Sequence, residues 1–69
     1  MVEVFKTNIE EEELAQKLTL KLLQHFPHCK INFDLQDCDN ILRVEGTEIA
    51  PEKIIQVLNT SGYMCDVLD

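Results

Sequence analysis

Apolar residues recur along this chain with two different spacings. Alternation with a period of two marks residues 2–7, 29–35 and 41–45, and a short apolar run follows at 63–68. Steps of three and four residues mark 14–26 and 54–61 instead. Because a period of two is typical of a strand and a period of 3.6 of an amphipathic helix, the pattern predicts the order strand, helix, strand, strand, helix, strand.

The start and end of the first predicted helix carry recognisable signals. Thr7 or Asn8 is a candidate N-cap, with a glutamate three residues later at the spacing of a capping box. The acidic run 10–13 would then lie in the first turn, where the helix dipole favours negative charge. Pro27 cannot continue the helix, so it is predicted to end near residue 25 or 26.

The second predicted helix begins at Pro51, whose missing N–H costs nothing at the first helical position. It ends at Gly62, which suits a left-handed C-cap. Each helix carries one apolar stripe that is expected to be buried. The stripes comprise Leu14, Ala15, Leu18, Leu22 and Phe26 in the first helix, and Ile54, Val57, Leu58 and Ser61 in the second.

Two helices on one face of a four-stranded antiparallel sheet satisfy this order of elements. The predicted fold is therefore α+β, a ferredoxin-like βαββαβ sandwich with strand order 4-1-3-2. The 69 residues leave room for a single domain, residues 1–69. Leu42 and Val44 are predicted to face the helices. A patch on the outer face of the sheet, away from the helices, is predicted to contain Phe5, Ile41, Met64 and Leu68.

Composition narrows the range of partners. The net charge is −7 and no concentrated basic face is visible, so neither nucleic acid nor an anionic membrane surface is an expected partner. No apolar run approaches the ~18 residues that cross a bilayer, and the first residues do not resemble a secretory signal. We expect a cytoplasmic protein without a cofactor.

The last third of the chain, from Ala50 through Gly62-Tyr63 to Leu68, closely resembles the end of a heavy-metal-associated domain. That family includes copper chaperones, mercury carriers and the amino-terminal modules of metal-pumping ATPases. The resemblance implies a Met-x-Cys-x-x-Cys loop after the first strand, where two thiolates hold a soft metal ion. Residues 7–13 contain no cysteine, so the resemblance implies the scaffold without its metal site.

Other residues of the chain are candidates for a relocated metal site. His25, His28 and Cys29 offer two imidazoles and a thiol, which suit zinc or copper. Cys38 lies in the predicted hairpin and is the thiol expected to be exposed, so a pair of such thiols from two molecules is a second arrangement. Structural roles compete, because His25 suits a helix C-terminus, and Cys29 and Cys65 are expected in the core. No metal site is predicted, and these residues stay candidates.

Enzymatic activity is not predicted, because no serine–histidine–acid set is visible and a thin two-layer domain offers little concavity. The leading hypothesis is a protein-interaction module. It would contact a protein partner or a second copy, as a homodimer, through the outer sheet face or an acidic end formed by residues 10–13, Asp37 and Asp39. The alternative is a metal carrier or sensor with a relocated site. A third class, small-molecule binding between dimerised domains, requires a dimer first.

Overall fold

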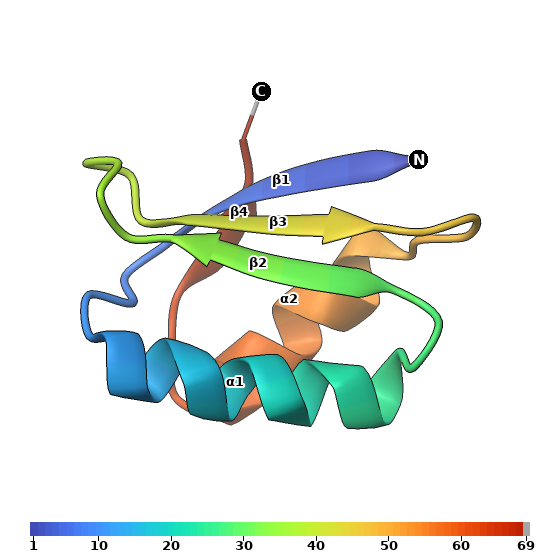
Figure 1. Cartoon of the computed structure of the whole chain (residues 1–69), viewed down its shortest axis with the longest axis horizontal. Helices are drawn as coiled ribbons and strands as arrows, with labels where there is room; N and C mark the ends of the chain where they lie inside the picture. The colour runs from blue at the N-terminus through green and yellow to red at the C-terminus, as the bar shows by residue number, and fades with distance from the viewer. Residues whose placement is uncertain (69) are drawn as a thin grey trace.

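The computed structural model describes residues 1–68 and contains six elements in the predicted order. Both helices lie on the same side of the sheet (Figure 1). The predicted ferredoxin-like α+β fold is therefore confirmed. The strands are β1 (Val2–Thr7), β2 (Lys30–Asp34), β3 (Ile41–Glu45) and β4 (Cys65–Val67), and the helices are α1 (Glu12–His25) and α2 (Pro51–Thr60).

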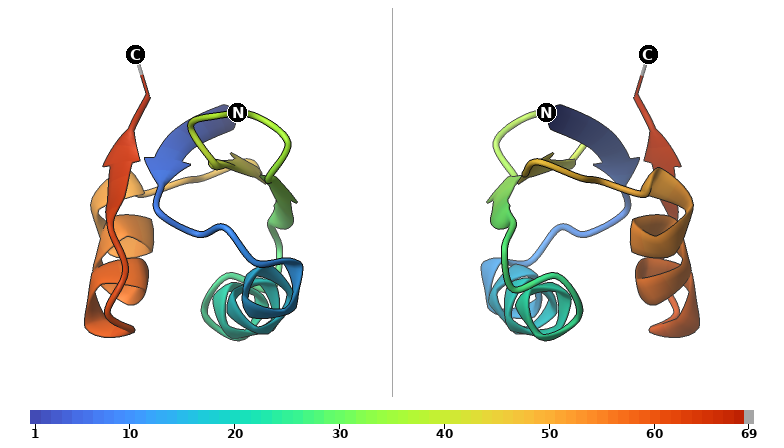
Figure 2. Two further views of the ribbon diagram at one scale, coloured as in Figure 1. Left: turned by 90° about the vertical axis from the view of Figure 1, so that its left-hand side faces the viewer. Right: turned by 90° about the vertical axis from the view of Figure 1, so that its right-hand side faces the viewer.

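The sheet has the order β2-β3-β1-β4, which is the predicted order read from the other edge. All three pairings are antiparallel, and β1 lies between β3 and β4. The edges are thus formed by β2 and β4. Figure 2 shows α1 beneath the β2 side of the sheet and α2 beneath the β4 side. Each helix therefore lies close to one free edge.

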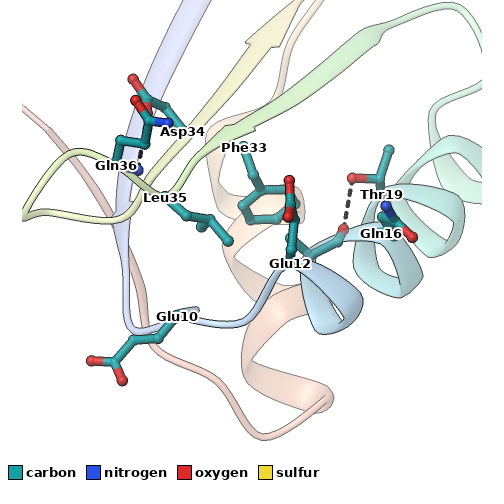
Figure 3. A pocket seen from close by; sticks show the side chains of 9 residues that line it. Glu10, Glu12, Gln16, Thr19, Phe33, Asp34, Leu35 and Gln36 are labelled. Atoms are coloured by element: carbon teal, nitrogen blue, oxygen red, sulfur yellow. Dashed lines mark hydrogen bonds between the residues drawn. The ribbon is translucent and has the colours of Figure 1, made fainter.

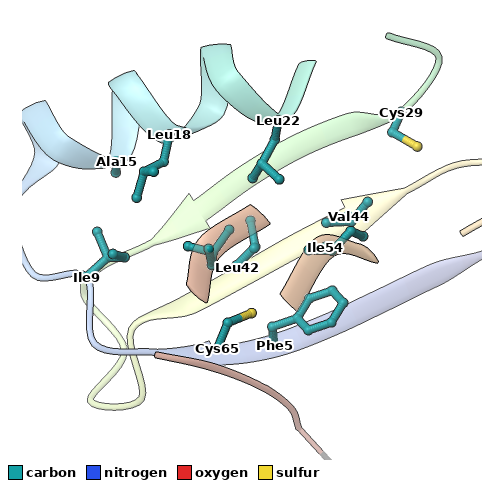
Figure 4. Close-up of a cluster of buried hydrophobic side chains, with 11 residues drawn as sticks. Phe5, Ile9, Ala15, Leu18, Leu22, Cys29, Leu42, Val44, Ile54 and Cys65 are labelled. Carbon is teal, nitrogen blue, oxygen red and sulfur yellow. The ribbon is translucent and has the colours of Figure 1, made fainter. Parts of the chain in front are cut away.

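One cluster of apolar side chains fills the space between the sheet and the helices (Figure 4). Leu42 and Val44 are fully buried, as predicted. The helix stripes also face inward, although Leu14, Phe26 and Val57 are only half-buried at their margins. The buried apolar residues are Phe5, Ile9, Ala15, Leu18, Leu22, Cys29, Leu42, Val44, Ile54, Leu58 and Cys65.

The prediction that Phe5 projects from the outer face of the sheet is wrong, because its side chain is 0% exposed. Phe5 lies directly opposite Leu42 of β3, and opposite residues of an antiparallel pair share one face. Both therefore face the helices. Val2 lies with Lys6 on the opposite, outer face of β1, and 49% of its surface is exposed. Burying an aromatic ring removes more apolar surface from water than burying a valine, which favours this orientation of β1.

The predicted N-caps of α1, Thr7 and Asn8, are also wrong, whereas its predicted end near residue 25 or 26 is confirmed. The N-cap is Glu11, without a side-chain cap hydrogen bond, and only Glu12 and Glu13 provide negative charge in the first turn. The hydroxyl of Thr7 instead accepts a hydrogen bond from the Ile9 N–H at 3.1 Å. This local bond holds the chain between strand and helix in an irregular loop, so the helix begins at Glu12, three residues later than a cap at Asn8 would allow.

The end of α2 follows the sequence signal. Gly62 has a φ of +96°, the left-handed conformation that glycine adopts without steric cost. The Tyr63 N–H donates to the Leu58 carbonyl at 3.0 Å, so the turn satisfies one of the free carbonyls at the end of the helix. The chain then enters β4, which is shorter than the predicted 63–68.

Candidate functional site

A groove of about 600 Å³ lies between the start of α1 and the end of β2 (Figure 3). The groove separates the side chains of the edge strand β2 from those of the helix α1. One wall comes from α1 and the segment before it, and the other from β2 and the residues that follow it. The lining residues are Glu10, Glu12, Ala15, Gln16, Thr19, Phe33, Asp34, Leu35 and Gln36.

The floor of the groove is apolar. Phe33 and Leu35 are half-buried and pack against the core from the sheet side. On the helix side Ala15 has a short side chain, which leaves room above it. The Thr19 hydroxyl donates to the Ala15 carbonyl at 2.7 Å, so this polar group is satisfied within the helix and its methyl group is left for contacts. A bound apolar side chain would therefore meet carbon atoms.

The upper wall of the groove ends at a free sheet edge. Within residues 1–68, β2 pairs with β3 and with no other strand. Every second residue of such a strand points its N–H and C=O away from the sheet. Proteins block such edges with proline, bulges or charged side chains. In β2 five residues pair with β3 in continuous register without a proline, and its charged residues, Lys30 and Asp34, lie at the two ends of the strand. The opposite edge, β4, has three residues.

The rim of the groove is acidic. Glu10 and Glu12 come from the α1 side and Asp34 from β2, and all three are exposed. No lysine or arginine lines the groove. Among residues 1–68, the ion pair that forms joins Arg43 to Glu45 at 3.8 Å on the sheet, so none of the three rim carboxylates is neutralised by a neighbouring cation. One Asp34 oxygen accepts a weak bond from the Gln36 N–H at 3.2 Å.

Three connecting loops meet beside the groove. The Thr7 hydroxyl donates to the Asn40 carbonyl at 2.7 Å. The Asn8 side-chain oxygen accepts from the Met64 N–H at 2.9 Å. Between them Ile9 is 0% exposed and fills the core beneath the loop. Sequence analysis did not single out Ile9, although its isolated apolar side chain among polar neighbours was a signal that it anchors the loop.

The structure does not bring His25, His28 and Cys29 together as metal ligands. Both histidines are exposed, whereas Cys29 is buried. The Cys29 sulfur packs against Gly46, where an added Cβ would lie only 2.9 Å from Sγ. The thiol is thus held in the core by close packing, facing away from the solvent that surrounds the two imidazoles. The structural role weighed for Cys29 from the sequence is therefore confirmed.

A different set of metal-ligating side chains gathers in the β2–β3 connection. One ligand atom each from Asp37, Cys38 and Asp39 lies within 4.8 Å of the others, and this is the set of three that residues 1–68 bring together. Cys38 is exposed, as predicted. The Asp37 carboxylate already accepts the Asp39 N–H at 2.9 Å. Two carboxylates and a thiol combine hard and soft metal ligands. The hydrogen bond from the Asp39 N–H accounts for the position of the Asp37 carboxylate without a metal ion.

The predicted outer-face patch is interrupted by charge. Met64 is 63% exposed and Leu68 is 38% exposed, while Ile41 is half-buried. Ile41 pairs with Lys6 of β1 on one side and with Asp34 of β2 on the other, and Lys6 in turn pairs with Asp66 of β4. Charged side chains therefore flank Ile41. The outer face therefore lacks a continuous apolar surface of the kind that marks a large interface.

A second hollow of about 550 Å³ lies between the two helices. Its lining includes Lys21, His25 and Lys53, so its charge is opposite to that of the α1–β2 groove. The Lys21 ammonium donates to the Ser61 hydroxyl at 2.6 Å and links the helices. Lys21, which lines the second hollow, therefore has a structural role in holding α1 and α2 together.

Burial raises the pKa of the Cys65 thiol from 9.0 to about 12, and the adjacent Asp66 carboxylate adds to the shift. The folded protein then keeps a proton that the unfolded chain loses, so the free energy of unfolding is expected to fall as the pH rises from 9.0 to about 12. Urea unfolding at several pH values measures the decline. Cys65→Ala lacks the thiol and should show a shallower decline; equal slopes in both proteins would contradict this account.

The comparisons with known proteins assign no family. No protein-family model matches the chain, and no curated protein gives a significant match. The likeness to heavy-metal-associated domains therefore rests on the residues of the last third and stays a prediction. Within residues 1–68, no helix is both long and apolar enough to span a membrane.

Proposed function

We propose that this protein is a non-enzymatic protein-interaction module, built on a scaffold like that of heavy-metal-associated domains without the thiol pair. Its binding surface is the β2 edge together with the adjoining groove, called here the α1–β2 groove. A segment of a partner protein binds there in an extended conformation and adds a fifth strand to the sheet. Main-chain hydrogen bonds supply affinity in this mode, and pockets for alternate side chains supply specificity.

The observation that carries this proposal is the coincidence of an unpaired strand edge with a hollow on its inner side. An added strand would place alternate side chains below the sheet, above α1. The floor at that position is formed by Phe33 and Leu35. The edge thus offers backbone partners and the groove offers apolar contacts to the same bound segment.

The outer sheet face supports an interaction less well. Its exposed apolar residues Met64 and Leu68 are accompanied by charged neighbours, whereas the α1–β2 groove combines shape, free backbone groups and apolar floor in one place. We therefore assign contact with a partner to the β2 edge.

Site-specific photo-crosslinking tests the proposal. A photoreactive residue replaces Gln16, which lines the groove, or Gln24, which is exposed on the same helix and does not line it. In the native cellular setting, a discrete protein adduct is expected at position 16 and not at position 24. Equal labelling at both positions, or adducts at 24 alone, would contradict binding at the groove.

Metal carriage with a relocated site is the second candidate function. The observation that favours it is the approach of Asp37, Cys38 and Asp39 within 4.8 Å. It predicts that Cu(I) or Zn(II) stays bound in a fixed ratio after dialysis and is lost in Cys38→Ser. The interaction proposal predicts no such retention, so one titration of the purified protein separates the two functions.

A further inference from the structure

We infer that the segment added to β2 is basic, with lysine or arginine side chains alternating with apolar ones. This inference rests on the proposed function and names the chemistry of its partner. Neither the comparisons nor the fold alone supplies this chemistry. It follows from the charges and apolar surface that the α1–β2 groove presents.

The charge of the partner follows from the rim. Glu10 and Glu12 lie on the α1 side of the β2 edge, and Asp34, which pairs with Ile41, lies on the outer face of the same edge. None of the three has a cationic partner among residues 1–68, and the whole chain carries a net charge of −7. A cationic segment would gain attraction from the carboxylates on both sides of the β2 edge and from the field of the whole molecule. An anionic segment would be repelled by the same groups.

The apolar half of the pattern follows from the floor. Side chains of a strand alternate between its two faces, so every second residue of the added segment would point toward Phe33 and Leu35. A purely basic segment would leave these side chains uncovered. Lysine and arginine also carry apolar stems that pack on such surfaces while the charged ends reach the rim.

Synthetic peptides test the inference. The probe is a fluorescein-labelled octapeptide of alternating lysine and valine, which presents either set of side chains to the groove after a one-residue shift in register. Threonine–valine and glutamate–valine octapeptides serve as charge controls. A lysine–valine peptide with every backbone nitrogen methylated cannot donate the ladder hydrogen bonds. Fluorescence anisotropy measures the affinity at about 0.1 M and at about 0.5 M salt. The Debye lengths at these concentrations are roughly 10 and 4 Å.

Variants of the protein locate the site. Neutralising the rim in Glu10→Gln/Glu12→Gln/Asp34→Asn is expected to weaken lysine–valine binding about tenfold, the product of three modest exposed ion pairs. Glu48→Gln/Glu52→Gln/Asp66→Asn changes the net charge equally, by three units, at exposed positions that do not line the groove. That matched variant should bind almost as the wild type does. Circular dichroism checks that both variants remain folded.

The expected result is binding of the lysine–valine peptide alone, weakened by salt, by backbone methylation and by rim neutralisation. Equal binding of the threonine–valine peptide would overturn the basic partner while leaving strand addition intact. Equal weakening in both triple variants would show non-specific attraction and would overturn the assigned site. If no peptide binds at millimolar concentration the inference fails, and crosslinking at position 16 still decides the proposed function independently.

Discussion

Phe5→Ala is expected to lower the free energy of unfolding by about 3–5 kcal/mol, because it removes a fully buried ring and leaves a cavity in the core. A domain of this length has a total stability of roughly 3–10 kcal/mol. The variant should therefore be partly unfolded at room temperature or unfold at much lower urea concentration. Urea unfolding followed by circular dichroism measures the loss.

Val2→Ala on the same strand provides the control. Val2 is 49% exposed on the outer face, so its truncation should change stability by less than about 0.5 kcal/mol. The two variants together report which face of β1 is buried. A larger loss from Val2→Ala than from Phe5→Ala would mean that β1 turns the opposite face toward the helices.

Ile9→Ala is expected to cost about 2–5 kcal/mol, the range for truncating a buried isoleucine. Ile9 lies in a loop, where substitutions are usually tolerated, but its side chain is 0% exposed and lies beneath the meeting point of three connections. The loss should appear as a lower urea midpoint with an unchanged slope.

Leu20→Ala is the matched control for the loop. Leu20 is a large apolar residue that is 65% exposed on α1, so its truncation should leave the midpoint nearly unchanged. A loss in Ile9→Ala no greater than that in Leu20→Ala would mean that the loop after β1 is not anchored in the core.

Most of the fold was predictable because the strongest sequence signals agreed with one another. Leu42 and Val44 alternate with Arg43 in a short strand, and their inward orientation is confirmed. Pro51 and Gly62 mark the two ends of α2 through backbone properties that do not depend on the rest of the fold. These local preferences and the global arrangement point to the same structure, as is usual for natural sequences.

The orientation of β1 was not predictable from its own residues. Val2 and Val4 favour one face, and Phe5 favours the other, so the strand pattern alone is divided. The choice is made by pairing, which places Phe5 opposite Leu42, and pairing is invisible in a single strand. The caps failed for a similar reason, because Thr7 forms a hydrogen bond with Asn40, a residue distant in sequence.

The candidate site was predictable only in part. The sequence predicted acidic residues at one end of the sandwich, and the predicted strand order 4-1-3-2 put the second strand at an edge of the sheet. The sequence could not show that Glu12 and Asp34 line the same hollow, because the depth of that hollow depends on how far α1 lies from β2. The small side chain of Ala15, chosen in the sequence as a core residue, contributes to that depth.

Hydrogen exchange of the backbone amides, measured with and without the lysine–valine octapeptide, tests strand addition at the α1–β2 groove most directly. The account predicts that, at saturating peptide, the outward-facing amides of β2 become protected while the amides of β4 exchange at unchanged rates. Protection of β4 instead, or unchanged exchange in β2 while the peptide is bound, would contradict it.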